Sequence, residues 1–157
     1  LDNGLSREFV VSNFAGSSEF QNVCNEFGIK RGSIPAQQSR DKNPNLTAFV
    51  NRLYTKLLDR QGEEAGLNNW CAAILAKTST PKKIAHDFVF SKEFELKKLN
   101  NEKFVEYMYR TFMGREYDAA GKAAWVKYLQ QGKTREDVFN GFADSTEFAN
   151  ITKGFGL

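Results

Sequence analysis

The chain of 157 residues offers few side chains for acid–base or nucleophilic chemistry. His86 is the only histidine, and general acid–base catalysis most often uses this residue type together with a matched base or nucleophile. The sequence contains no nucleophile motif and no glycine-rich phosphate-binding loop that would complete such a site. We therefore expect neither a catalytic centre nor a cofactor, and the protein is predicted not to be an enzyme.

Cys24 and Cys71 are the next candidates for chemistry. They fit no metal-binding motif and have no second pair of cysteines to work with. In a secreted protein they would form one disulfide, which would stabilise the fold by about 3–4 kcal/mol in the chain-entropy model. In a reducing compartment they would be two buried thiols. The sequence leaves both alternatives open.

Two arginines, Arg60 and Arg115, occupy the same position in two similar acidic loops. A guanidinium group there is suited to hold the carboxylate or phosphate of a ligand through two hydrogen bonds. The alternative, which we favour, is an internal ion pair with an acid such as Glu64 or Asp118. The acidic residues of these loops lack the alternating oxygen pattern of a calcium-binding loop, so we expect them to be solvated.

The composition argues against two classes of partner. The net charge of +3 is small, and no run of lysine and arginine is interleaved with aromatic residues, so a nucleic-acid-binding groove is not expected. No apolar stretch approaches the roughly 18 residues of a membrane-spanning helix, and no signal-peptide pattern stands at the start. Aromatic residues make up 13% of the chain, so we expect a core built around rings.

Most of the sequence is explained by a repeat. Residues 49–95 and 104–149 match position by position, at an offset of 55 that falls to 54 after a one-residue deletion. Apolar residues at i, i+1, i+4, i+5, i+8 and i+9 form one wide stripe, which is typical of an amphipathic helix and not of a strand. The stripe of the first helix consists of Phe49, Val50, Leu53, Tyr54, Leu57 and Leu58 in one copy and of Phe104, Val105, Met108, Tyr109, Phe112 and Met113 in the other.

Three more helices complete each repeat: one with a tryptophan on its apolar face, one with a short apolar stripe, and one opened by Ser-x-Glu-Phe. We call the first two helices the front half of the repeat and the last two the back half. Motif residues at matching places are expected to cap and pack these helices. They are Arg60, Gly66, Trp70, Ser91, Glu93 and Phe94 in one copy, and Gly114, Arg115, Asp118, Gly121, Trp125, Ser145, Glu147 and Phe148 in the other.

The N-terminal residues match a back half alone, with Ser17-Ser18-Glu19-Phe20 in place of the later motif. We therefore predict an all-α fold of about ten short helices and no sheet. Residues 1–29 form the back half of a first repeat, 30–45 a polar linker or crossover, 46–100 the second repeat and 101–157 the third. The linker is interpreted as an ordered crossover, with a flexible hinge as the alternative. A chain that opens on a back half implies a front half upstream, and so further domains of the same polypeptide.

This combination of motifs resembles one bacterial family, the domain of unknown function 4214, which is described as phycobilisome-linker-like. The resemblance rests on the motif residues given above together with Leu53-Tyr54 and Tyr109, and it covers nearly the whole chain except the linker. The second repeat departs from the pattern in its loop, with Asp59 in place of glycine and Glu63 in place of aspartate. The resemblance implies an all-helical module of large, secreted or surface-associated, multi-modular bacterial proteins, with no settled biochemical activity.

Aromatic residues are the remaining candidates for ligand binding. An exposed Trp70 or Trp125 would suit stacking on a sugar or anchoring a partner. Each lies within an apolar helical face, however, so we expect both to pack in the core. Tyr117, Tyr128 and Phe155 are the aromatic residues least tied to the helical stripes, and they form the predicted ligand surface.

We therefore expect a non-catalytic module of a larger secreted or cell-surface bacterial protein, acting as a scaffold, a protein-interaction domain or a spacer. Stacked repeats offer an extended outer surface, which suits such a role. The alternative is a carbohydrate-binding module that targets an attached enzyme to polysaccharide or cell wall. The expected partner is accordingly a protein or a cell-surface polysaccharide.

Overall fold

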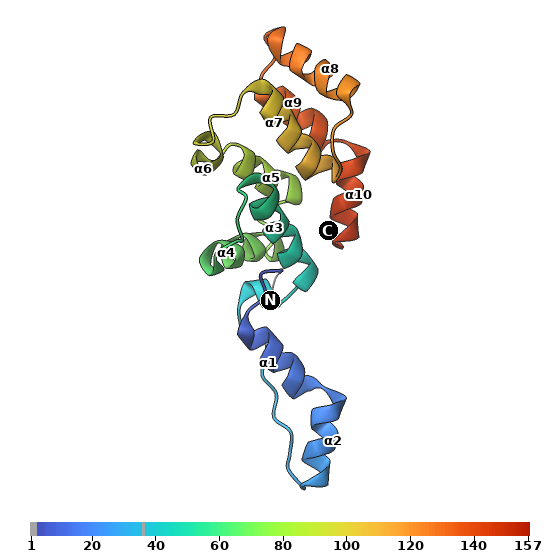
Figure 1. The fold of residues 1–157 in the computed structure, drawn as a ribbon. Helices are drawn as coiled ribbons and strands as arrows, with labels where there is room; N and C mark the ends of the chain where they lie inside the picture. The colour runs from blue at the N-terminus through green and yellow to red at the C-terminus, as the bar shows by residue number, and fades with distance from the viewer. Residues whose placement is uncertain (1–2, 36) are drawn as a thin grey trace.

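The computed structural model describes residues 3–35 and 37–157, and within these ranges it contains helices and loops but no strand (Figure 1). The α-helices are α1 (Arg7–Gly16), α2 (Ser18–Glu26), α3 (Pro44–Leu57), α4 (Glu64–Leu75), α5 (Pro81–Val89), α6 (Lys92–Glu95), α7 (Asn101–Met108), α8 (Ala119–Gln130), α9 (Arg135–Ala143) and α10 (Thr146–Gly154). A 3₁₀ turn η1 (Ser39–Asp41) precedes α3, and a π-helical turn η2 (Tyr109–Met113) continues α7. No helix of the described part is long and apolar enough to cross a membrane. The all-α prediction is confirmed.

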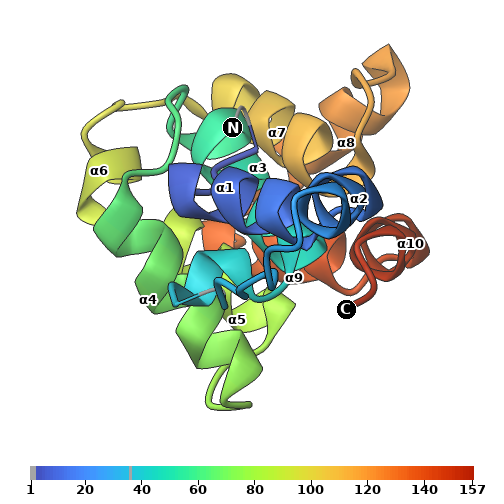
Figure 2. The ribbon, with the colours of Figure 1, turned by 90° about the horizontal axis from the view of Figure 1, so that it is seen from below.

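The helices form two parts of different shape. α3 to α10 pack into a body, and α1 and α2 project from it as a hairpin (Figure 1). The view from below places this hairpin in front of the body (Figure 2). α1 and α2 correspond to the predicted back half of a first repeat, α3 to α6 to the second repeat, and α7 to α10 to the third.

Local sequence decides where the helices begin. A serine precedes each fourth helix of the repeat, and its hydroxyl accepts a hydrogen bond from the backbone N–H three residues later, as an N-cap does. The donor–acceptor pairs are Phe20–Ser17, Phe94–Ser91 and Phe148–Ser145, at 3.2, 3.2 and 3.1 Å. The projecting hairpin is therefore capped in the same way as the two complete repeats.

The loop after the first helix turns alike in both complete repeats. Gly114 has a φ of 64°, and Asp59 at the matching position has a φ of 54°. A left-handed residue just past a helix end is common, and a non-glycine residue adopts it at a small cost. The Asp59 carboxylate accepts hydrogen bonds from Lys97 Nζ and Tyr107 Oη, each at 2.6 Å. Asp59 thus keeps the turn that glycine makes in the third repeat and adds a link to α7.

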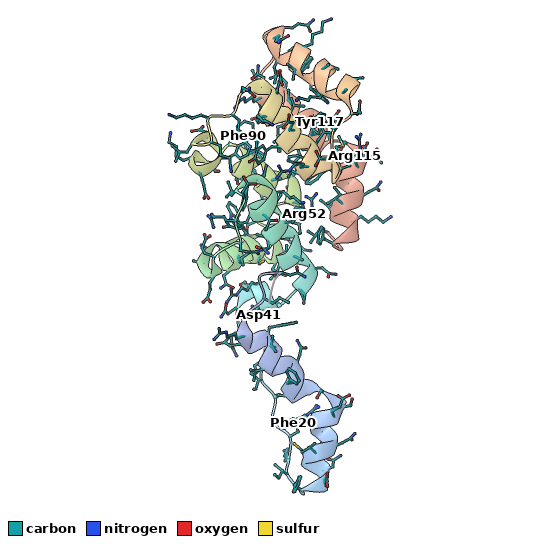
Figure 3. All side chains as sticks on the ribbon, viewed as in Figure 1. Phe20, Asp41, Arg52, Phe90, Arg115 and Tyr117 are labelled. Atoms are coloured by element: carbon teal, nitrogen blue, oxygen red, sulfur yellow. The ribbon has the colours of Figure 1, made fainter. Side chains whose placement is uncertain are left out.

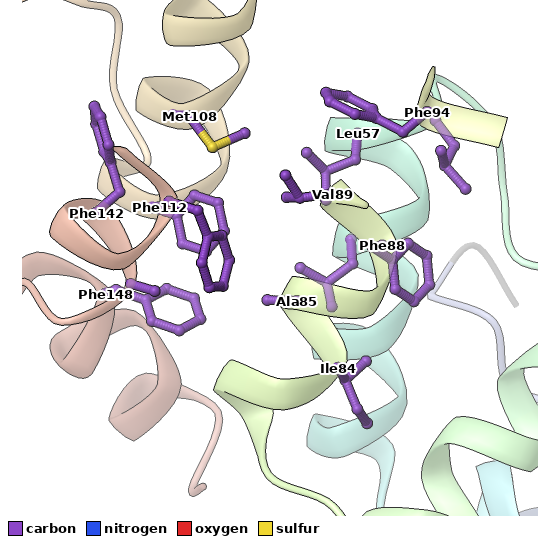
Figure 4. Packing of buried hydrophobic residues seen from close by; sticks show 14 of the residues in the cluster. Leu57, Ile84, Ala85, Phe88, Val89, Phe94, Met108, Phe112, Phe142 and Phe148 are labelled. Carbon is purple, nitrogen blue, oxygen red and sulfur yellow. The ribbon is translucent and has the colours of Figure 1, made fainter. Parts of the chain in front are cut away.

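The second and third repeats face each other through reciprocal contacts. The ring centroids of Phe49 in α3 and Phe148 in α10 are 6.4 Å apart, and those of Phe104 in α7 and Phe94 in α6 are also 6.4 Å apart. Phe104 corresponds to Phe49 and Phe148 to Phe94, so each contact is the counterpart of the other. An approximate two-fold axis therefore relates the two repeats, and their side chains fill one shared core (Figure 4).

The described part of the predicted crossover, residues 30–35 and 37–45, contacts both parts of the molecule. After α2 the chain returns alongside α1, where the Arg31 guanidinium donates a hydrogen bond to the carbonyl of Gly16 at 3.0 Å. η1 then packs on α4, and the backbone N–H of Arg40 donates to the side chain of Asn68 at 3.1 Å. The crossover therefore has contacts to the hairpin on one side and to the body on the other.

Asp41 fixes the hairpin to the body at their junction (Figure 3). Its side chain is buried, and it accepts a hydrogen bond from the backbone N–H of Ser6 at 2.9 Å. The Ser6 hydroxyl donates to the same carboxylate and caps α1 by accepting from the N–H of Phe9. Because a buried carboxylate needs such partners, this contact positions the start of α1.

Candidate interaction surface

An apolar surface covers one side of the projecting hairpin. Val11, Phe14, Phe20 and Val23 are 53%, 72%, 43% and 48% exposed. With Ile34 of the returning chain they line a hollow of about 640 Å³, which Glu19 also lines. We call these six residues the α1–α2 face. Contiguous large apolar side chains in contact with solvent are typical of an interaction site.

Most matching positions of the complete repeats are buried. Phe14 corresponds to Phe88 in α5, which is 3% exposed, and to Phe142 in α9, which is 0% exposed. The counterparts of Val11 and Phe20 are buried as well, whereas those of Val23 are half-buried. The buried back-half positions include Ile84, Ala85, Val89, Phe94, Val138, Phe139, Ala143 and Phe148. A back half of this sequence is therefore an inner surface wherever its front half is present.

The front half covers the back-half phenylalanine from two directions. In the second repeat the ring of Phe88 lies 4.7 Å from Tyr54 of α3, edge to face, and 5.6 Å from Trp70 of α4, measured between centroids. Such aromatic pairs stabilise a fold beyond the area that they bury. The third repeat has the same arrangement, formed by Phe142 with Tyr109 at 5.0 Å and Trp125 at 5.1 Å.

The motif glycines are explained by this arrangement. A Cβ atom on Gly66 would lie 2.1 Å from the Tyr54 hydroxyl oxygen, and one on Gly121 would lie 2.2 Å from the Tyr109 hydroxyl oxygen. Both tyrosine rings are held in the core with 4% exposure, so they cannot move aside easily. Glycine is required because the second helix of the front half must approach the tyrosine of the first.

Arg60 joins the front half to the back half. Its guanidinium donates to Glu93 at 2.7 and 2.9 Å in a bidentate pair, and to Glu63 at 2.5 Å. The hydrogen bonds from Arg60 hold the pKa of both carboxyl groups below their ordinary value. The expected internal ion pair is present, but the predicted partner Glu64 is wrong. Glu64 pairs instead with Arg40 of the crossover at 2.7 Å.

Arg115 makes a looser version of this contact. It lies 3.6 Å from Asp118, the predicted partner, and its guanidinium stands 5.3 Å from the centre of the Tyr109 ring. Asp118 mainly caps α8, where it accepts a hydrogen bond from the N–H of Gly121 at 2.7 Å. The arginine therefore occupies the same position in the two loops, but among the described residues Arg60 pairs with two acids and Arg115 with one.

A protein-family model recognises the same architecture. The model for the domain of unknown function DUF4214 matches residues 32–97 and, a second time, residues 85–152. The chain belongs to this family. No curated protein and no solved structure matches the chain. The two DUF4214 matches overlap at the back half of the second repeat, where α5 and α6 lie, and the first of them begins within the crossover.

The DUF4214 tryptophans are less buried than the sequence suggested. Trp70 and Trp125 are both half-buried and pack against the edge of the core. Each indole packs on a phenylalanine of the back half, and Trp125 also packs on Tyr128. Both tryptophans therefore contact the core but lie at its edge, not inside it as expected.

The three residues of the predicted ligand surface have different packing neighbours. Phe155 packs on Phe49 at 5.7 Å, and Tyr128 packs on Trp125 at 5.8 Å, so both belong to the packing around the core. Tyr117 is 38% exposed, and its ring centroid lies 6.5 Å from that of Tyr109. Each of the three rings is therefore engaged with a neighbouring aromatic residue.

The cysteines are free thiols and form no disulfide with each other. Cys24 lies in the projecting α2, whereas Cys71 is fully buried in α4, with its sulfur 3.4 Å from the Thr47 hydroxyl. Burial raises the pKa of the Cys71 thiol. The disulfide alternative is wrong for this structure because the two helices belong to different parts of the fold.

His86 connects the two complete repeats. Its Nε2 atom lies 3.0 Å from the Glu136 carboxylate, and its ring lies against Phe90 and Phe139 at 4.6 and 5.2 Å. Asn140, at the matching position of the third repeat, lines the same small hollow as His86 and Glu136. Among the described residues no group of three His, Cys, Asp or Glu side chains is arranged to hold a metal ion.

Sequence reasoning missed the α1–α2 face. Its residues were matched to a back half, and their exposure was not predicted. The signal that pointed to them was the match of residues 1–29 to a back half alone.

Proposed function

We propose that this DUF4214 chain is a non-catalytic protein-interaction and scaffold module that binds a protein partner through the α1–α2 face. The observation that carries the proposal is the 72% exposure of Phe14, at a position where both counterparts are buried. Burying one phenylalanine fully contributes about 1.5–3 kcal/mol. The four exposed apolar residues of the hairpin therefore represent a large free energy that a partner would recover.

The wider setting follows from the family resemblance, which supports a module of a larger secreted or cell-surface bacterial protein. The likeness of the family to phycobilisome linkers points in the same direction, because those helical units hold other proteins together. Among the described residues no three His, Cys, Asp or Glu side chains are placed to hold a metal ion, and the contact of His86 with Glu136 joins the two complete repeats.

Carbohydrate binding is the less favoured role. A sugar site combines an aromatic platform with polar groups placed to orient the ligand. The predicted aromatic platform is dispersed, with Phe155 and Tyr128 packed around the core. The α1–α2 face carries Glu19 as its charged group and is otherwise lined by small polar and apolar residues.

The proposal is tested by photo-crosslinking in extracts of the organism that encodes the chain. A benzoyl-phenylalanine replaces Phe14 in one variant and exposed Lys127 of α8 in the control. We expect a protein adduct of defined mass at position 14 and none at position 127. An adduct that is degraded by glycosidases, or equal labelling at both positions, would contradict the proposal.

A further inference from the structure

The complete repeats of this chain show what covers a back half, and this identifies the kind of partner that the α1–α2 face fits. We infer that this partner is a further DUF4214 front half, beyond those of the second and third repeats: two helices that carry a tyrosine, a loop arginine and a tryptophan at the spacing of Tyr54, Arg60 and Trp70. The inference rests on the proposed function and names its partner. It is carried by three independent correspondences between the hairpin and the body.

The first correspondence is in the aromatic packing. Phe88 and Phe142 each lie between a tyrosine of the first helix and a tryptophan of the second, at centroid distances of 4.7 to 5.6 Å. Phe14 occupies the same position on α1 and is 72% exposed. A partner that supplied both rings would reproduce a contact that this chain already makes twice.

The second correspondence is in charge. Glu19 matches Glu93, which accepts two hydrogen bonds from Arg60. Glu19 is exposed at the edge of the hollow, and the bond it makes is a weak one from the neighbouring Ser18 hydroxyl at 3.3 Å. An arginine in the loop of an incoming front half would reach this carboxylate as Arg60 reaches Glu93.

The third correspondence is in how the surface is held. α1 and α2 are capped by Ser6 and Ser17 in the way that α9 and α10 are capped by Thr134 and Ser145. Asp41 and Arg31 fix the hairpin to the body and to its own returning chain. The acceptor surface is therefore formed before the partner arrives, which lowers the entropic cost of binding.

A second copy of this chain is a poor source of the front half. Both of its front halves already cover a back half of their own, since Phe88 and Phe142 are 3% and 0% exposed. Releasing one would expose a core. The covering front half is therefore one other than those of the second and third repeats.

The test uses a labelled synthetic peptide of residues 43–76, which contains Tyr54, Arg60 and Trp70, added to the intact chain under reducing conditions. We expect saturable binding by fluorescence anisotropy, with NMR shift changes concentrated in α1 and α2. Phe14→Ser in the chain should weaken binding about 10-fold or more, as truncation of a central anchor does. Because Phe14 is exposed, this variant should keep the circular dichroism spectrum of the original chain. A peptide carrying Tyr54→Ala and Trp70→Ala is the matched control and should not bind.

The charge contact has its own test. Glu19→Gln should weaken binding of the original peptide about 2- to 5-fold, as loss of an exposed ion pair does. The same variant should leave the affinity of an Arg60→Gln peptide unchanged, because the two substitutions remove one shared interaction. Equal effects on both peptides would show that Glu19 does not meet the arginine.

Two outcomes separate this inference from the proposed function. If the peptide is helical by circular dichroism and still fails to bind while a protein is crosslinked at position 14, the surface is functional and the partner is of another kind. If the chain instead dimerises in sedimentation experiments and Phe14→Ser abolishes the dimer, a second copy covers the α1–α2 face. Either outcome overturns the inference and leaves the interaction surface standing.

Discussion

Phe14 in the projecting hairpin and Phe142 in the body occupy the same position of one repeat, follow similarly capped helix starts and have opposite surroundings. Phe14 is 72% exposed, whereas Phe142 is 0% exposed between Tyr109 and Trp125. The hairpin and the body therefore show one back half in two states, uncovered and covered. In the described residues a front half covers each back half of the body, and none covers the hairpin.

This comparison separates two causes of structure. The helices of the hairpin form because local signals start them, such as Ser17 accepting a hydrogen bond from the N–H of Phe20. The burial of their apolar side depends on residues far away in the chain, and no such residues pack on the hairpin within the part that the structure describes. Short helices have little stability on their own, so the contact of Asp41 with Ser6 matters for holding the hairpin in place.

The largest expected effect tests the two phenylalanines directly. Phe142→Ala should lower the free energy of unfolding by about 3–5 kcal/mol because it leaves a cavity between two fixed rings. Phe14→Ala should change it by no more than about 0.5 kcal/mol, as exposed positions do. Urea unfolding followed by circular dichroism measures both.

A milder variant guards against loss of the fold. If Phe142→Ala does not fold, Phe142→Leu should still unfold at a lower urea concentration than the original chain, with a loss of about 1–2 kcal/mol. Equal losses for Phe14→Ala and Phe142→Ala would mean that the hairpin is covered in solution and that the comparison is wrong.

The regular parts of the fold were predictable because their signals are local. The helix stripes, the serine caps and the left-handed turn at Gly114 each depend on residues within a few positions of one another. Because the second and third repeats match in sequence, each feature predicted in one repeat is also expected at the matching residues of the other. An ordered crossover was also a reasonable expectation, because its length of polar chain had to connect two helical parts.

The predictions from sequence were wrong where a side chain's partner lies far away in the chain. Arg60 has several acids within reach in sequence, and only the folded chain shows that Glu93, thirty-three positions on, is preferred to Glu64. Phe155 looked free of the helical stripes because its partner Phe49 belongs to the other complete repeat. The two-fold pairing of the repeats could not be read from one copy, since neither copy contains the axis.

A smaller loss of stability is expected when the close contact between the two helices of a front half is disturbed. Gly121→Ala should destabilise the chain by about 1–3 kcal/mol, because its Cβ would lie 2.2 Å from the Tyr109 hydroxyl oxygen. Tyr109→Phe removes that oxygen, so Gly121→Ala should cost much less in this background. Thermal unfolding of the two single variants and the double variant gives the coupling between the sites.

The hairpin provides the control for the glycine. Gly16 is the last residue of α1, and a Cβ atom there would meet no atom within 4 Å. Gly16→Ala should be neutral or stabilise the chain by up to about 1 kcal/mol, because alanine loses less entropy in a helix. A large loss at Gly16, or no rescue of Gly121→Ala by Tyr109→Phe, would show that packing against tyrosine is not the reason for the motif glycine.

The smallest expected effect is a difference between the two complete repeats in how pH changes the contribution of the loop arginine to stability. The pKa values of Glu63 and Glu93 are lowered first of all by hydrogen bonds from Arg60, from an ordinary value of 4.5. A carboxyl whose pKa is lowered by folding adds stability above its unfolded pKa, and this stability is lost as the pH falls through the folded pKa. Arg60→Gln should therefore cost at most about 1 kcal/mol near neutral pH, since all three groups are substantially exposed.

That cost should shrink as the pH falls below 4.5, because protonation of the two glutamates removes the same interaction in the original chain. Arg115→Gln is the matched variant, and its cost should be smaller and nearly independent of pH. The reason is that the pKa of Asp118 is lowered first by the backbone N–H of Gly121, which the substitution leaves in place. Urea unfolding of both variants at about pH 7 and about pH 4 decides the matter. If the two substitutions lower the free energy of unfolding equally at both pH values, the bidentate contact of Arg60 with Glu93 adds no stability to the second repeat. The inference that an incoming arginine pairs with Glu19 would then lose its main support.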